Sequence, residues 1–215
     1  MKNLIYKELR LSINPLFYLF ALLASLILIP NWVYFIAVSY LLYIAIPNIF
    51  TLSKAQNDIA FSVLLPVRKR DVVGARIISI ALLEVLQLVV AGFFCWLNSI
   101  LYSHENFLLN ANAAFIGFCF MMFGIFNLIF FPMFYRTANK VGIPAVAGII
   151  AATLFAGGVE VFAVLVPWAK AAFDTPDPST VIWKIGTLVV GIIVFVVLTY
   201  LAYRAAAKRF ERIDL

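Results

Sequence analysis

Three polar side chains lie deep inside apolar stretches of the sequence, where ionisable and amide groups are costly: Glu84, Gln87 and Glu160. Glu84 follows Arg76 by eight residues, which places it roughly 12 Å into a membrane if the segment is helical. Gln87 comes three residues later on the same helix face. This pair forms either the polar wall of a substrate path or a structural contact, such as a protonated carboxyl bonded to a neighbouring helix. The sequence leaves both alternatives open.

Glu160 follows the pair Gly157-Gly158, roughly 25 Å along a helix that begins at Ile143. Two adjacent glycines weaken a helix, and Pro167 lies one or two turns further on. We therefore expect a bend here, or a span followed by a short re-entrant helix. Glu160 would then lie near the outer membrane surface as a carboxylate that snorkels to water, with a pathway role as the alternative.

Three asparagines, Asn48, Asn98 and Asn127, also lie within apolar runs. We expect their amides to hydrogen-bond between helices rather than to bind a substrate.

The chain lacks the motifs of common catalytic and nucleotide sites. It contains no G-x-x-x-x-G-K-S/T phosphate loop, and no H-E-x-x-H or G-x-S-x-G. The single His104 stands beside Glu105 in a loop and cannot form a convincing metal site alone. Cys95 and Cys119 lie in apolar runs, where a thiol behaves as a small hydrophobe, and no disulfide is expected. We expect this chain to be neither an enzyme nor the holder of a cofactor.

These residues must be positioned by membrane helices. Apolar residues make up 65% of the 215 residues and charged residues only 12%, whereas soluble domains carry roughly 25% charged residues. Crossing a bilayer takes about 20 apolar residues. Six segments qualify or come close: Leu16–Ile29, Trp32–Leu52, Ile77–Leu101, Ala113–Phe134, Ile143–Trp168 and Val181–Tyr203. The sequence therefore predicts an all-α, polytopic membrane protein with six transmembrane helices in one domain, residues 1–215.

The basic residues predict the orientation of these helices. Fourteen of the 16 lysines and arginines fall on one side of the six segments, and only Lys170 and Lys184 fall on the other. The positive-inside rule makes the basic side cytoplasmic, which places both termini inside. The net charge of +6 is thereby explained by topology, and nucleic-acid binding is not expected.

Residues 1–14 predict an amphipathic helix in the membrane interface. Its apolar and polar residues lie on different faces: Ile5, Leu9 and Ile13 against Lys7, Arg10 and Asn14. The alternative is a frayed basic tail that only sets the topology.

The connection 53–76 contains an unusual apolar stretch, Ile59–Leu65, which is too short to span and too apolar for a solvated loop. It needs a partner surface, either the bilayer interface or another protein. Asn57 or Asp58 can cap a short helix here, and Pro66 would end it. Such a helix across the cytoplasmic face could receive force from a soluble partner.

The opening MKNLIYKELRL, the loop NDIAFSVLLPVRKRDVVGARII and the six-span layout together resemble the ABC-2 type transporter permeases, especially the compact bacterial ones. The resemblance implies a permease without its own nucleotide site, paired with separate ATPase subunits that hold ATP and Mg. It implies that residues 1–14 form a connecting helix and that the coupling helix contacts the ATPase through Asn57, Asp58, Ile59, Phe61, Leu64 and Leu65. Two permease chains, identical or related, would line the pathway.

The resemblance further implies a bacterial plasma membrane and export rather than import. The apolar, aromatic-rich composition favours an amphipathic, peptide or lipid-like cargo. Two other classes remain as alternatives: a non-transporting immunity or assembly factor, and an intramembrane enzyme, which would need catalytic residues clustered at one depth.

Overall fold

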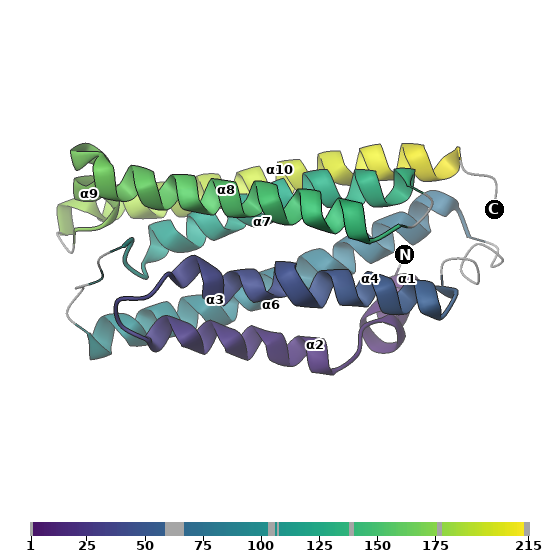
Figure 1. Cartoon of the computed structure of the whole chain (residues 1–215), viewed down its shortest axis with the longest axis horizontal. Helices are drawn as coiled ribbons and strands as arrows, with labels where there is room; N and C mark the ends of the chain where they lie inside the picture. The colour runs from purple at the N-terminus through teal and green to yellow at the C-terminus, as the bar shows by residue number, and fades with distance from the viewer. Residues whose placement is uncertain are drawn as a thin grey trace.

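The computed structural model describes residues 2–58, 67–102, 106, 108–137, 140–175 and 178–212. This part of the chain is helical throughout its regular elements and contains no strand. The helices lie side by side in an elongated bundle (Figure 1). Five of them are long and apolar enough to cross a membrane, or six if the bent N-terminal pair counts as one span. The prediction of an all-α polytopic protein is confirmed, and six spans is the upper count.

The N-terminal segment is helical but sharply bent. Helix α1 (Lys2–Lys7) and the π-helical turn η1 (Glu8–Ser12) meet the next segment at 84°. That segment consists of α2 (Leu16–Leu19) and the 3₁₀ helix η2 (Phe20–Leu28). Because a 3₁₀ helix rises about 2.0 Å per residue, this short span reaches roughly 24 Å instead of the roughly 20 Å of an α-helix.

The second span runs continuously over Tyr34–Ala55 and contains α3 (Tyr34–Tyr40), η3 (Leu41–Ala45) and α4 (Ile46–Ala55). The wider π-helical turn η3 comes just before Pro47. Proline has no N–H, and its ring clashes with the carbonyl four residues earlier, so a widened turn before it relieves the clash.

The third and fourth long segments are α6 (Lys69–Leu101) and α7 (Ala113–Arg136), and α7 is the most buried of the candidate spans. Helix α6 begins eight residues before the predicted start at Ile77 but ends at Leu101 as predicted. Helix α7 begins at the predicted residue because Asn112 caps it, accepting hydrogen bonds from the amides of Ala114 (2.8 Å) and Phe115 (3.2 Å).

The fifth segment is a span followed by a short helix, as expected, and the break lies before Pro167 rather than at the two glycines. Helix α8 (Gly142–Leu165) continues through Gly157-Gly158, and the break falls at Val166, which is extended (φ −95°, ψ 110°). A short helix, α9 (Pro167–Phe173), follows. The proline decides the break because the residue before a proline avoids the helical conformation, whereas a glycine only weakens a helix.

Helix α10 (Val181–Glu211) packs against α7 at a point where both helices carry glycine. A Cβ placed on Gly117 would lie 2.5 Å from the carbonyl oxygen of Thr187, and one placed on Gly191 would meet the backbone of Gly117. These glycines therefore let the two backbones approach closely. Helix α10 is otherwise peripheral, since 11% of its most apolar window is buried against 72% for α7.

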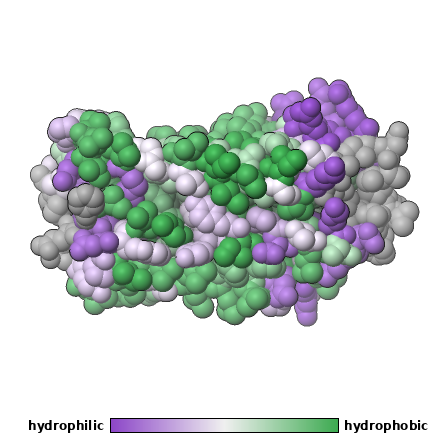
Figure 2. Space-filling model, in the orientation of Figure 1, coloured by the Kyte–Doolittle hydropathy of each residue, from purple (hydrophilic) through white to green (hydrophobic). Residues whose placement is uncertain are grey.

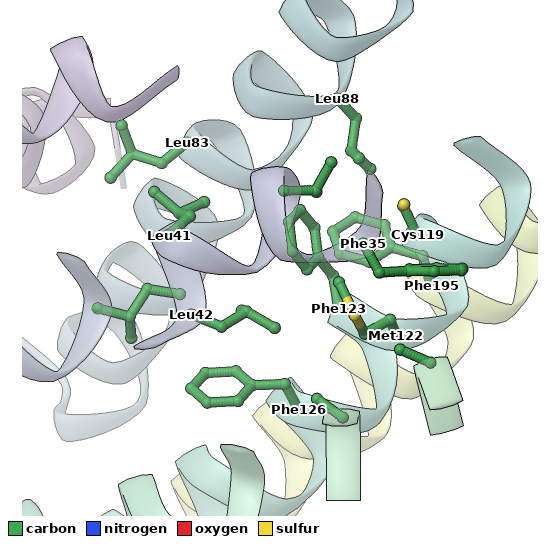
Figure 3. Packing of buried hydrophobic residues seen from close by; sticks show 14 of the residues in the cluster. Phe35, Leu41, Leu42, Leu83, Leu88, Cys119, Met122, Phe123, Phe126 and Phe195 are labelled. Carbon is green, nitrogen blue, oxygen red and sulfur yellow. The ribbon is translucent and has the colours of Figure 1, made fainter. Parts of the chain in front are cut away.

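The core is rich in phenylalanine. Phe50 of α4 packs edge-on against Phe130 and Phe134 of α7, with ring centroids 4.9 Å and 4.7 Å apart. Further along the bundle, side chains from four spans meet in one cluster (Figure 3). The labelled members include Phe35 and Leu42 of the second span, Leu83 of α6, Phe123 of α7 and Phe195 of α10.

Two of the three asparagines within apolar runs join helices as predicted. The amide of Asn98 donates to the carbonyl of Ile27 at 2.8 Å, and that of Asn127 donates to Glu84 at 2.8 Å. The prediction for Asn48 is wrong, because its amide donates to the carbonyl of Ile44 in its own helix (2.8 Å).

Helix α1 and the C-terminal end of α10 lie toward the same end of the bundle, whereas α9 lies at the other (Figure 1). Hydrophilic surface gathers at the end with the termini, and apolar surface covers the flank (Figure 2). Such an apolar flank is what a bilayer requires.

Candidate functional site

A charged cluster lies at the end of the bundle that holds the termini. Arg76, on the second turn of α6, is 2% exposed. Its Nε lies 2.6 Å from Oε2 of Glu8, and its Nη2 donates to Oε1 of Glu8 at 3.1 Å. The same guanidinium donates to the hydroxyl of Ser53 (2.6 Å) and pairs with Asp58. Lys7 also pairs with Asp58. One buried arginine thus joins η1, the end of α4 and the start of the following loop.

Local backbone geometry brings these side chains together. The 84° bend carries η1 across the bundle end, where Glu8 faces inward with 2% exposure. After α4 ends, Asn57 adopts a left-handed conformation (φ 52°), which asparagine tolerates better than most residues. That turn directs Asp58 back toward Arg76, within 3.4 Å of the hydroxyls of Ser12 and Ser53.

The cluster is buried, so water screens its charges poorly and each charge affects the pKa of its neighbours. The side chains of Arg76 and Glu8 are each 3% exposed, and the guanidinium lies over the ring of Phe50 at 5.6 Å. Burial raises the pKa of Asp58, but the hydrogen bond from Lys7 and the charge of Arg76 outweigh it, so the pKa lies below its ordinary value. Asp58 is therefore an anion at neutral pH, held between two cations.

The predicted coupling residues divide between the cluster and the rest of the loop. Asn57 and Asp58 are described, but Ile59, Phe61, Leu64 and Leu65 lie outside the described residues. The Asp58 side chain is directed toward Arg76 and Lys7, and a coupling role for these residues stays a prediction.

Sequence reasoning missed Glu8, Arg76 and their pairing. One signal was available, because Glu8 is the only acidic residue before Asp58 and stands within an otherwise basic, apolar segment.

The predicted intramembrane pair is fully buried. Glu84 and Gln87 of α6 are both 0% exposed. Oε2 of Glu84 accepts a hydrogen bond from Asn127 of α7, and the same amide donates to the hydroxyl of Thr199 of α10 at 3.1 Å. A polar contact therefore joins three helices at one level, which is the geometry of the structural alternative. A pathway role for Glu84 and Gln87 stays a prediction.

Within the described residues this polar contact is incompletely satisfied. Buried atoms without a partner include Oε1 of Glu84, both polar atoms of the Gln87 amide and Oδ1 of Asn127. Since each such atom costs free energy, the site favours any rearrangement that supplies a polar partner.

Glu160 lies near the opposite end of the bundle. It is 7% exposed, and Oε2 accepts a hydrogen bond from the amide of Leu109 at 3.0 Å. The interpretation of Glu160 as a carboxylate that snorkels to water is therefore wrong. Beside it, Asp174 accepts hydrogen bonds from the backbone amide (2.8 Å) and side chain (2.7 Å) of Asn110. These contacts fasten the connection before α7 to α8 and α9.

Among the described residues, no group of three or more histidine, cysteine or acidic side chains could hold a metal ion. Cys95 and Cys119 are buried and unpaired with each other.

The sequence profile of the ABC-2 family transporter proteins matches residues 3–211, nearly the whole chain. The chain belongs to the ABC-2 transporter family. Searches among curated proteins and among solved structures gave no match. The family and the apolar helices together identify a multi-pass membrane protein, the permease component of an ABC transporter. In this ABC-2 permease the charged cluster occupies the start of the loop that was predicted to couple to an ATPase.

Proposed function

We propose that this ABC-2 permease serves an ATP-driven exporter and that its loop between α4 and α6 receives force from a separate ATPase subunit, which holds ATP and Mg. Family membership supports the general class. The observation that carries the mechanism is the buried ion pairing of Arg76 with both Glu8 and Asp58. Through it, the residue that begins the loop is tied to two other elements.

The charged cluster would act as a mechanical joint. Displacement of residues 59–66 would pull on Asp58, and Asp58 would pull on Arg76 because the two side chains form a poorly solvated ion pair. Asp58 also pairs with Lys7, so part of the displacement would pass directly to the N-terminal segment. Helix α6 has 33 residues and is therefore roughly 50 Å long, so a tilt at Arg76 would reach the other end of the bundle. Glu8 would pass the same movement to the N-terminal segment.

Charge supports the proposed orientation, and family membership supports the proposed assembly. The basic end would face the cytoplasm of a bacterial plasma membrane, where the ATPase is found, and both termini would lie there. A second permease chain, identical or related, would complete the pathway, as membership of the ABC-2 family suggests. The cargo would be amphipathic, a peptide or a lipid-like molecule.

Co-purification with a candidate ATPase tests the proposal. The permease is expressed with the ATPase encoded beside it, solubilised and purified through a tag on the permease. We expect the ATPase to co-purify and its hydrolysis rate to change on binding. Phe61→Asp or Leu64→Asp should abolish the association while membrane insertion is retained. Gln56→Asp, which adds the same charge at an exposed site just before the loop, is the matched control.

The outcome separates the alternatives. If the wild-type chain recruits no ATPase, the exporter proposal fails and a non-transporting immunity or assembly role gains support. If the ATPase binds but tolerates both loop variants, the contact surface is assigned wrongly although the permease function stands.

A further inference from the structure

A groove between α6 and α10 runs from the basic end of the bundle into its apolar flank. It consists of two adjoining hollows of about 820 Å³ and 400 Å³. The two hollows share Tyr200 and Tyr203 in their lining and therefore adjoin along α10. The mouth of this groove lies near the C-terminal end of α10, and its inner part is lined by apolar residues of α6 and α10.

The mouth of the groove carries an excess of positive charge. Arg70 is paired with Glu211 there, and Nη2 of Arg70 donates to Oε2 of Glu211 at 3.2 Å. The other basic side chains of the mouth, Arg204, Lys208 and Arg212, have no carboxylate partner among the described residues. Asp214 follows in the sequence, and counting it still leaves four cations against two acids. This excess of positive charge favours binding of an anion at the mouth.

The inner part of the groove is apolar and open to the side. Ile78 of α6 and Val196 of α10 line it and are 40% and 57% exposed, and Ala81 lines it about one turn after Ile78 on α6. Thr199 supplies a polar atom to the lining, but its hydroxyl already accepts from Asn127. A hydrocarbon chain fits this lining, because burial of apolar surface is its main source of affinity.

We propose that this groove binds one anionic phospholipid of the adjacent membrane leaflet. Its phosphate lies among Arg204, Lys208 and Arg212, and one acyl chain lies along Ile78 and Val196. Charge complementarity selects this occupant. A zwitterionic lipid would leave the cations uncompensated, and basic pockets between membrane helices are recognised headgroup sites.

Charge also disfavours a second copy of the chain as the occupant. Each copy has a net charge of +6 and presents the same basic residues at the same end, so two parallel copies would bring like charges together at this groove. Free phosphate would neutralise the basic side chains of the mouth but would not contact the inner apolar lining. An anionic lipid satisfies both parts, and as a resident ligand it is distinct from the transported cargo.

Native mass spectrometry of the purified full-length chain in a non-ionic detergent tests the proposal. Dioleoyl phosphatidylglycerol and dioleoyl phosphatidylcholine are titrated separately. We expect one phosphatidylglycerol to bind roughly tenfold or more tightly than phosphatidylcholine. Arg204→Ala combined with Lys208→Ala should weaken phosphatidylglycerol binding by roughly tenfold or more. The matched control, Lys54→Ala with Arg136→Ala, removes two exposed cations outside the groove and should change binding less than about twofold.

A second pair of variants tests the apolar part. Ala81→Trp fills the groove and should abolish tight binding, whereas Leu82→Trp, at a neighbouring position outside the lining that is 47% exposed, should not. Thermal unfolding without lipid checks that each variant is folded. Equal losses in the two double variants would reduce the effect to general surface attraction and overturn the proposal. The proposal would also be overturned by equal binding of both lipids, by tight phosphatidylglycerol binding to the Ala81→Trp variant, or by formation of a disulfide-linked dimer of the Ile78→Cys variant.

Discussion

The guanidinium of Arg76 and the carboxylate of Glu8 form a buried ion pair, with Nε and Oε2 2.6 Å apart, although 68 residues separate them in the sequence. The pair fixes the N-terminal helical segment onto the start of α6. Because Asp58 shares the same guanidinium, the position of the loop is coupled to that of the N-terminus.

Arg76→Ala should lower the free energy of unfolding by about 3–5 kcal/mol, because it leaves two carboxylates near a buried site without their main counter-charge. The measurement is denaturant or thermal unfolding of the purified chain in detergent. Arg136→Ala, an exposed arginine at the same end of the bundle, should cost less than about 0.5 kcal/mol. Equal losses of unfolding free energy in the two variants would show that the charged cluster stabilises the fold no more than an exposed arginine does.

Combining Arg76→Ala with Glu8→Ala should cost less than the two single substitutions added together. Residues that share an ion pair are coupled, so removing the second partner relieves the unpaired charge that the first substitution created. The coupling energy comes from a double-mutant cycle on the same unfolding measurement. Additive costs would show that the two side chains act independently.

The sequence predicted the helix ends that the apolar runs mark locally. The predicted start of α7 at Ala113 is correct, and the structure shows that Asn112 caps the helix there. The predicted end of α6 is correct because the apolar run stops at Leu101. Helix α6 begins earlier than predicted because a helix can continue beyond the membrane into polar sequence. The pairing of Glu8 with Arg76 could not be predicted, since it depends on how the chain bends at Ser12 and turns at Asn57.

The Asp58 contact should be insensitive to pH between about 5 and 8 and weaken only in stronger acid. The folded-state pKa of Asp58 lies below the ordinary value of about 3.9, so its stabilisation is complete above that value and is lost as pH falls through the lower, folded pKa. Unfolding midpoints measured from pH 8 to pH 3 check this. Asp58→Asn should show a shallower loss of stability at the acid end, and a loss beginning near pH 6 would contradict the assignment.

Gly191→Val should disrupt the contact between α7 and α10, because a Cβ at this position meets the backbone of Gly117, which cannot move aside as a side chain could. We expect a loss of about 1–3 kcal/mol in unfolding free energy, or more if the helices separate. Gly186→Val is the matched control on the same helix, since a Cβ there has nothing within 4 Å. A similar loss in both variants would point to helix propensity rather than to close packing.

Glu84→Gln and Glu84→Leu together test the intramembrane contact. The amide introduced by Glu84→Gln retains an acceptor for Asn127, so stability should change by less than about 1 kcal/mol. Glu84→Leu removes the acceptor and should cost about 1–3 kcal/mol, and adding Asn127→Leu should recover part of that loss. Transport by the reconstituted permease with its ATPase separates structure from function. If Glu84 is structural, Glu84→Gln transports at the wild-type rate across pH, whereas a pathway role requires the rate to change while stability does not.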